Sequence, residues 1–167
     1  MAKTLYLLRH AKSAWDDPGA SDRERGLNRR GRRNAPLMGR ALSQRINAQT
    51  VHVSPARRAQ LTLGGLRDGW PELQRLSHVT VEALYTFSAD DLADWLRQRD
   101  DSEDPLFLIG HNPAFTDLVN WVCGEEVLDN LPTAGFAHLE LDTDSWAHLR
   151  AGCGRLVDRL FPRELDQ

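Results

Sequence analysis

The sequence has only two cysteines, Cys123 and Cys153, and neither has a neighbouring His or Cys at the spacing of a metal site. This argues against a disulfide framework and against a zinc centre. The first residues run into an apolar stretch without the apolar segment and small-residue cleavage site of an export signal, and nothing later is long enough to span a membrane. We therefore expect a cytoplasmic protein with no metal, no cofactor and no membrane partner.

The sequence also has no excess of basic residues: it contains 21 Lys and Arg and 24 Asp and Glu, which gives a net charge of -3. Nucleic-acid binders usually carry excess positive charge, so no nucleic-acid partner is expected. With 41% hydrophobic and 27% charged residues over 167 positions, and no repeat or low-complexity tract, the chain predicts a single domain, 1–167. We expect a monomer.

Charge is nevertheless uneven along the chain. Residues 23–40 carry seven arginines and one Glu. This pattern is typical of a solvated, arginine-rich helix face, and equally of a basic surface that attracts an anionic substrate or an acidic partner. The sequence leaves both interpretations open.

The apolar run from Thr4 to Leu8 shows no alternation and stops on Arg9 and His10. Such a run is typical of a strand that is covered on both faces of an α/β sheet. Hydrophobic periodicity and turn residues predict the other elements. These are strands at 51–54, 79–82, 106–109, 136–141 and, at an edge, 154–161; helices at 30–46, 56–70, 89–99 and 114–123, the second capped by Ser54 and the third by Ser88; and a long loop at 15–28.

This alternation predicts a three-layer α/β/α sandwich with a mostly parallel central sheet. Ligands of such sheets bind beyond the carboxyl ends of the strands, and four predicted strands end in polar groups there. These groups are Arg9 and His10, then Ser54 with Arg57 and Arg58, then Glu82, and finally His111. Two imidazoles, arginines and a carboxylate at one rim indicate a pocket for a phosphoryl group, with a nucleophile and a proton donor.

Longer motifs surround these groups in a fixed order. They are Leu8-Arg9-His10-Ala11-Lys12-Ser13, Asp22-x-x-Arg25-x-Leu27 with Gly31, Ser54-Pro55-Ala56-Arg57-Arg58-Ala59-x-x-Thr62, Glu82-Ala83-Leu84-Tyr85, Gly110-His111-Asn112-Pro113 and Pro132-Thr133-Ala134. The ordered set resembles the histidine phosphatase superfamily, and most of all its small SixA type of phosphohistidine phosphatase. The resemblance implies a phosphoglycerate-mutase-like fold and a metal-independent phosphatase that works through a phosphohistidine intermediate. The sequence departs from the common pattern at Ala11, where many members have glycine, and at the adjacent Lys12.

The same resemblance implies that His10 is the nucleophile and that Arg9, Arg58 and His111 bind the phosphoryl oxygens. An imidazole attacks through an unprotonated nitrogen, so we expect a backbone carbonyl to hold the other nitrogen of His10. No metal is needed if the arginines and a charged His111 supply enough positive charge. The spacing of the motif selects Arg58 over Arg57, and Ser13 is expected either to contact the phosphate or only to close a turn.

Glu82 lies where family members that cleave phosphate esters place their proton donor. A phosphohistidine substrate has an imidazole leaving group, which needs this acid less. The short connection between Thr62 and Glu82 leaves little material for a lid, which favours a histidine-phosphorylated protein as substrate. The alternatives are a small-molecule phosphomonoester hydrolase that uses Glu82 as general acid, and a phosphoprotein-binding module without turnover.

Overall fold

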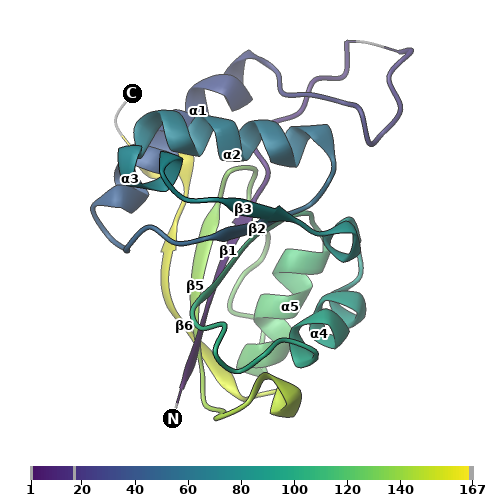
Figure 1. Cartoon of the computed structure of the whole chain (residues 1–167). Helices are drawn as coiled ribbons and strands as arrows, with labels where there is room; N and C mark the ends of the chain where they lie inside the picture. Colours follow the sequence, from purple (N-terminus) through teal and green to yellow (C-terminus); the bar gives the residue numbers. More distant parts are fainter. Residues whose placement is uncertain (1, 17, 166–167) are drawn as a thin grey trace.

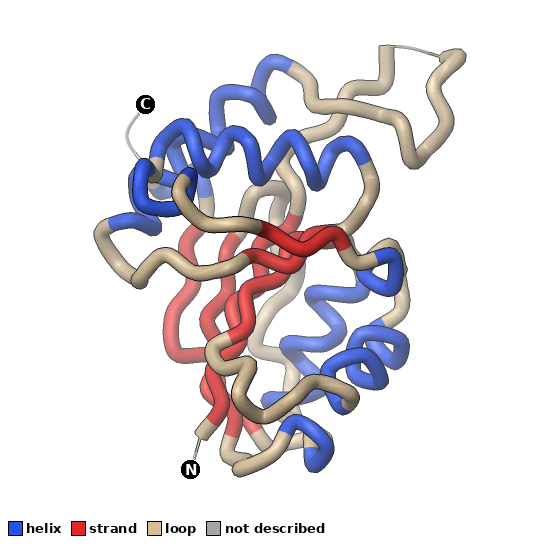
Figure 2. The backbone as a smooth tube through the Cα atoms, in the orientation of Figure 1, coloured by secondary structure: helices blue, strands red, loops and turns tan. Residues whose placement is uncertain are grey.

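A computed structural model of the chain, which describes residues 2–16 and 18–165, contains one six-stranded sheet in the order β3-β2-β4-β1-β5-β6 (Figures 1 and 2). The strands are β1 (Lys3–Arg9), β2 (Val51–Val53), β3 (His78–Thr80), β4 (Leu106–Gly110), β5 (Phe136–Leu141) and β6 (Gly154–Leu160). Strands β1, β2, β3 and β4 are parallel to one another, whereas β5 pairs antiparallel with both β1 and β6. The predicted, mostly parallel sheet with the last strand at an edge is confirmed.

Helices cover both faces of the sheet (Figure 1). They are α1 (Arg29–Ser43), α2 (Arg57–Gly69), α3 (Pro71–Gln74), α4 (Ala89–Arg97) and α5 (Ala114–Cys123), with short 3₁₀ helices η1 (Glu82–Leu84), η2 (Trp146–His148) and η3 (Pro162–Glu164). Two separate apolar clusters lie between the layers, one under α1 to α3 and the other under α4 and α5. The predicted three-layer α/β/α sandwich is therefore confirmed.

Strand β1 contributes to both clusters. Leu5 and Leu7 are fully buried against the α4 and α5 side, while Leu8 is fully buried against the α1 and α2 side. Each of these side chains contributes about 1.5–3 kcal/mol of hydrophobic free energy. The strand that leads into Arg9 and His10 is thus held from both faces, which fixes where those two residues emerge.

Two local predictions were wrong. The third strand spans His78–Thr80 rather than 79–82, so Glu82 lies in η1 and not at a strand end. Ser54 does not cap α2, because the N-cap residue is Ala56 and it makes no side-chain cap hydrogen bond. By contrast, the Ser88 hydroxyl accepts from the Asp91 N–H at 3.4 Å, which confirms the predicted cap of α4. In the described part of the chain, no helix has the length and apolar character required to cross a membrane.

Candidate active site

The polar residues meet beyond the carboxyl ends of β1, β2 and β4, which are adjacent in the sheet. The His10 N–H donates to the Gly110 carbonyl and the Ser54 N–H donates to the Ile109 carbonyl, both at 3.0 Å. Backbone pairing therefore continues past the strand ends. It brings His10 and Ser54 next to the end of β4, where His111 follows Gly110.

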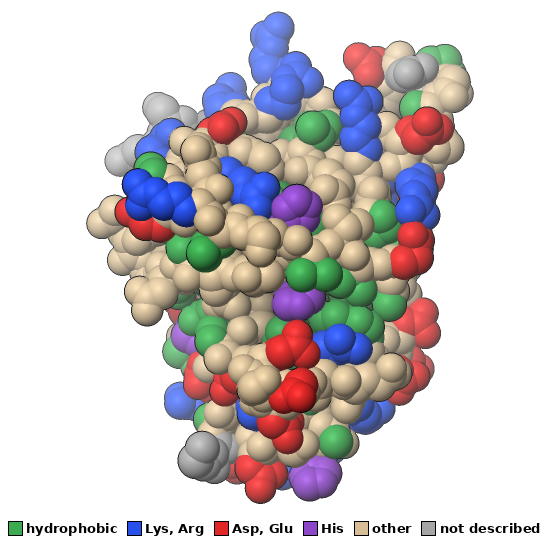
Figure 3. All heavy atoms as spheres, viewed as in Figure 1, with side chains coloured by type: hydrophobic (Ala, Val, Ile, Leu, Met, Phe, Trp, Pro, Cys, Tyr) green, Lys and Arg blue, Asp and Glu red, His purple; other side chains and the backbone are tan. Residues whose placement is uncertain are grey.

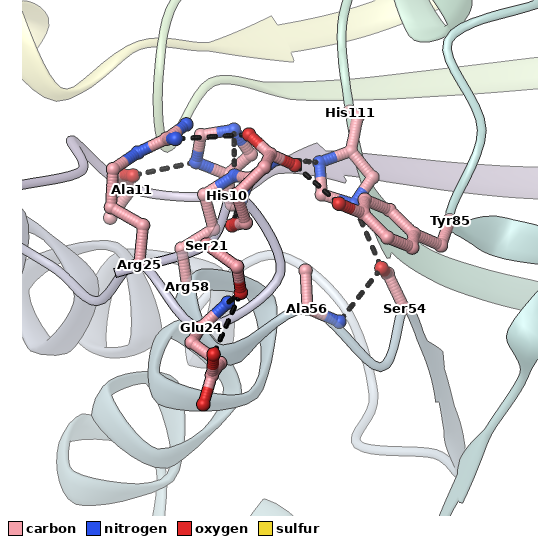
Figure 4. Close-up of polar contacts among 11 residues, drawn as sticks. His10, Ala11, Ser21, Glu24, Arg25, Ser54, Ala56, Arg58, Tyr85 and His111 are labelled. Atoms are coloured by element: carbon pink, nitrogen blue, oxygen red, sulfur yellow. Dashed lines mark hydrogen bonds and ion pairs between the residues drawn. The ribbon is translucent and has the colours of Figure 1, made fainter. Parts of the chain in front are cut away.

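His10 is buried, and its Nδ1 atom lies 2.7 Å from the Ala11 carbonyl oxygen (Figure 4). Since a carbonyl only accepts, Nδ1 carries the proton and Nε2 keeps its lone pair. Burial lowers the pKa of His10 to about 3, and the nearby His111, Arg58 and Arg9 push in the same direction against the Ala11 hydrogen bond. The structure thus presents a neutral imidazole with Nε2 available for attack at neutral pH.

Arg58 faces this nitrogen from the first turn of α2. Its side chain is 2% exposed, and its Nε atom lies 3.4 Å from Nε2 of His10. The neighbouring Arg57 is exposed, and its backbone N–H donates to the Arg23 carbonyl at 2.8 Å. Helical geometry turns successive side chains by about 100°, so only one of the two arginines can face the pocket. The structure brings Arg58 to His10 and leaves Arg57 outside.

His111 is held between Ser54 and Arg58. Its Nε2 atom lies 2.8 Å from the Ser54 hydroxyl, which also accepts from the Ala56 N–H, and its Nδ1 atom lies 3.5 Å from Nη2 of Arg58. Because Arg58 only donates, Nδ1 is assigned as the acceptor and Nε2–H as the donor to Ser54. Burial, followed by the charge of Arg58, lowers the pKa of His111 to about 3. The expected charged His111 is therefore neutral in this structure, because its surroundings are dry and already positive.

Arg9 reaches the pocket from the end of β1, and burial together with the charge of Arg58 lowers its pKa. Its Nη1 atom donates to the Leu131 carbonyl at 3.0 Å. The Ala134 N–H lies 3.0 Å from the carbonyl oxygens of both Arg9 and His10. Ala134 adopts a φ of 59°, a left-handed conformation that is uncommon for a residue with a Cβ. The 131–134 segment therefore holds the backbone of Arg9 and His10 in place.

Ser13 is buried, and its backbone forms an isolated bridge with Leu27. Among the described residues, no hydrogen bond joins its hydroxyl to Arg9, His10, Arg58 or His111. A Cβ added at Gly31 would lie 2.3 Å from the Lys12 carbonyl oxygen, so the start of α1 packs directly on this turn. The contacts of Ser13 favour the turn-closing interpretation.

Glu82 does not join the buried group. Its side chain is 70% exposed and makes a two-bond ion pair with Arg23, with both N···O distances at 2.8 Å. The hydrogen bond from Arg23 lowers the pKa of Glu82. Glu82 is thus an ionised carboxylate at the rim of the site.

Sequence reasoning did not assign a role to Asp22, Arg25 or Tyr85, although all three lie in the quoted motifs. The Asp22 carboxylate accepts from Arg58 at 3.1 Å, from Arg25 at 2.9 Å and from the Tyr85 hydroxyl, and the Asp22 carbonyl accepts from Arg58 at 2.6 Å. Burial would raise the pKa of Asp22, but the hydrogen bonds from Tyr85, Arg58 and Arg25 lower it to about 2. The loop before α1 therefore places a permanent negative charge on the outer side of Arg58.

The site suits an anion rather than a cation. His10 and His111 have ring centroids 5.3 Å apart, but Arg58 lies against both, and its charge opposes a metal ion. No cluster of three or more His, Cys, Asp or Glu side chains that could hold a metal occurs within residues 2–16 and 18–165. A phosphoryl group, with its negative oxygens, fits the guanidinium of Arg58 that faces Nε2 of His10.

Comparison with known proteins agrees with this geometry. Residues 5–111 match the sequence profile of the histidine phosphatase superfamily, branch 1. An uncharacterised chloroplast protein of Arabidopsis thaliana is 26% identical over 154 residues, which cover 87% of this chain and 70% of that protein.

Solved structures of histidine phosphatases also superpose on this chain. The proposed phosphohistidine phosphatase SixA of Agrobacterium tumefaciens superposes with a TM-score of 0.78 and 26% identity, over 96% of this chain and 98% of that one. A protein histidine phosphatase SixA complexed with tungstate gives 0.78 and 25% over the same shares. A mycobacterial glucosyl-3-phosphoglycerate phosphatase gives 0.67 at 16% identity, over 94% of this chain and 98% of that one, and shares the fold.

Proposed function

The chain belongs to the histidine phosphatase superfamily and is similar to its SixA type, and from this premise we propose that it removes phosphoryl groups from phosphorylated histidine side chains of proteins. In this proposal no metal takes part, His10 is the nucleophile, and Arg9, Arg58 and His111 bind the phosphoryl oxygens. The cytoplasmic location stays a prediction.

In the first step, Nε2 of His10 attacks phosphorus. A bond forms between Nε2 and phosphorus, the bond from phosphorus to the substrate nitrogen breaks, and the electron pair of that bond stays on the leaving imidazole. Nδ1 of His10 keeps its proton, because the Ala11 carbonyl at 2.7 Å holds it there. Arg9 and Arg58 stabilise the negative charge of the transferring group, which is the main requirement of phosphoryl transfer.

A neutral His111 contributes less charge than expected, but its state depends on the bound group. Its Nδ1 atom faces the pocket beside Arg58. A phosphoryl oxygen next to this nitrogen favours the protonated form and raises the pKa of His111. We therefore assign His111 to phosphate binding, with Ser54 as the residue that orients its ring.

In the second step, water attacks the phosphorus of phosphorylated His10. The bond between phosphorus and Nε2 breaks, and the imidazole leaves as a neutral ring because Nδ1 still carries its proton. The water oxygen becomes part of inorganic phosphate, and its proton goes to the phosphate or to solvent. This step needs no general acid.

The protonation state of Glu82 is the observation that supports one substrate class over the other. An ester releases an alkoxide, and a positioned acid is worth about two to four orders of magnitude in that step. Glu82 is ionised and paired with Arg23, so it has no proton to give at neutral pH. A phosphohistidine that is protonated on its second ring nitrogen leaves as neutral imidazole and needs no acid. Because only the ester needs an acid that Glu82 cannot supply, the ionised Glu82 supports phosphohistidine over small phosphate esters as the substrate.

The test compares the wild type and Glu82→Gln on free phosphohistidine, a histidine-phosphorylated carrier protein, an aryl phosphate and a panel of alkyl phosphate esters. We expect phosphohistidine substrates to be hydrolysed fastest, and Glu82→Gln to change their kcat/KM by less than about threefold. The small-molecule alternative requires the reverse. It predicts efficient turnover of the esters, a loss of about a hundredfold in Glu82→Gln, and untouched phosphohistidine.

A further inference from the structure

The two helical layers carry opposite charge. The sequence between Glu24 and Asp68 has ten arginines and no Asp or Glu, and it forms α1, β2 and α2. The sequence from Glu82 to Asp144, which includes α4 and α5, has fifteen acidic residues and only two arginines. Figure 3 shows basic side chains gathered over the α1 and α2 layer and acidic ones over the opposite half. The molecule is polarised although its net charge is only -3.

The positive charge is concentrated where α1 begins. Arg29, Arg30, Arg32 and Arg33 occupy its first residues, which include no acidic side chain. The partial positive charge of a helix N-terminus favours anions, so this placement disfavours the helix. These four arginines and Lys12 are exposed, and none of the five has an ion-pair partner in the part of the chain that the structure describes. Arg32 donates to the Leu27 carbonyl at 2.8 Å, whereas the charges of Lys12, Arg29, Arg30 and Arg33 are available to a partner.

A small hollow opens beside these residues, with a volume of about 60 Å³. Its lining consists of Arg30, Asn34, Pro132, Thr133, Phe161, Pro162 and Arg163. Asn34 is only 4% exposed, and its Oδ1 atom has no hydrogen-bond partner. This oxygen only accepts, so an anion in the hollow pairs with the guanidinium groups of Arg30 and Arg163 instead.

The hollow lies next to the segment that supports the backbone of His10. Pro132 and Thr133 line it, and the next residue, Ala134, donates its N–H to the carbonyl oxygens of Arg9 and His10, both at 3.0 Å. The start of α1 is tied to the turn that follows His10, because the Asn28 N–H donates to the Lys12 carbonyl at 3.0 Å. The hollow and the start of α1 are therefore within reach of residues that flank a phosphohistidine bound at His10.

We propose that the α1 basic surface, defined as Lys12, Arg29, Arg30, Arg33 and Arg163, binds acidic residues of the protein that carries the phosphohistidine, and that one carboxylate enters the hollow. The inference rests on the proposed function. The guanidinium forks of Arg30 and Arg163, which line the hollow, match a carboxylate. The acidic α4 and α5 layer repels the same partner and so sets its orientation.

The experiment uses two synthetic peptides with one phosphohistidine each, flanked by three glutamates in one and by three glutamines in the other. Free phosphohistidine is the third substrate. The enzymes are the wild type, Arg30→Gln/Arg163→Gln, and the control Arg40→Gln/Arg75→Gln, which removes two exposed charges of the same layer away from the hollow. Melting temperatures verify that both double variants fold.

In the wild type, kcat/KM for the glutamate peptide should exceed that for the glutamine peptide about tenfold through KM, and the ratio should shrink as salt increases. Arg30→Gln/Arg163→Gln should reduce the ratio to near one, leave free phosphohistidine hydrolysis within twofold, and differ from the control. The inference is overturned if the ratio survives in this variant, if the control loses it equally, or if single-stranded RNA but not a glutamate peptide competes at this surface. Wild-type activity on free phosphohistidine separately tests the proposed function.

Discussion

The floor and the rim of the site differ in how they are held. On the floor, His10, Arg58 and His111 are 6%, 2% and 1% exposed, and each is held by hydrogen bonds to buried neighbours. On the rim, Asp22, Arg23 and Glu82 are exposed and held by ion pairs. Buried groups in a dry, positive pocket determine the reaction, because charge interactions are strongest there. Exposed charges interact more weakly because solvent screens them, so we expect the rim to affect substrate choice more than the reaction itself.

The largest effect is expected from removal of His10, the proposed nucleophile. His10→Ala should lower phosphohistidine hydrolysis by at least about a thousandfold, because it removes the nitrogen that forms the proposed covalent intermediate. Rapid-quench trapping of the phosphoenzyme should find label on the wild type and none on the variant. The exposed His148 provides the control, and His148→Ala should retain activity. Failure to trap phosphate on wild-type protein would favour the binding-module alternative.

The next largest effect is expected from substitution of Arg58, compared with substitution of the adjacent Arg57. Arg58→Lys should lower kcat/KM about a hundredfold, since lysine cannot reproduce a planar fork that faces both histidines. Arg57→Lys should change it less than twofold, because that side chain is exposed. Steady-state kinetics on free phosphohistidine measure both. Equal losses in the two variants would contradict the assignment of Arg58 to the floor.

The third prediction concerns acid stability. Burial lowers the pKa of both His10 and His111 to about 3, whereas histidine in the unfolded chain has a pKa of about 6.5. Between these values the unfolded chain binds protons that the folded chain does not, so the free energy of unfolding falls as pH falls below 6.5. From pH 6.5 to 5 each histidine should cost up to about 2 kcal/mol.

Urea unfolding at pH 7.5, 6 and 5 measures this loss, and NMR titration should find both rings neutral throughout. His111→Gln should lose less stability over the same interval than the wild type. A wild type that is equally stable at pH 5 and 7.5 would show that the floor is not as dry as its burial indicates.

The smallest effect is expected at the rim. The Asp22 carboxylate and a phosphoryl oxygen both require donors of Arg58, so Asp22→Asn should tighten binding of inorganic phosphate or tungstate about fivefold. Glu24→Gln is the matched control on the same loop, because Glu24 bonds Ser21 and does not contact Arg58. Calorimetry gives both affinities. Weaker binding in Asp22→Asn would mean that Asp22 serves to orient Arg58 rather than to compete for it.

The sequence predicted the floor better than the rim, for a physical reason. A strand that is apolar throughout and stops at Arg9 and His10 has only one arrangement in a parallel sheet, and the same holds for the strand before His111. Glu82 follows a strand whose three residues are exposed, so no packing pattern marked where that strand ends. Ser54 stands where a cap is common, and only the position of His111 shows that its hydroxyl holds that ring instead.

The sequence by itself determined the order of strands and helices, the two-faced burial of β1 and the edge of the sheet to which the reactive residues come. These follow from local periodicity and from the geometry of parallel strands. Tertiary structure alone decided that Ser54 orients His111, that Asp22 pairs with Arg58 and that Arg23 neutralises Glu82. These pairs are 57, 36 and 59 residues apart, and their specific contacts arise only when the strands bring the loops together.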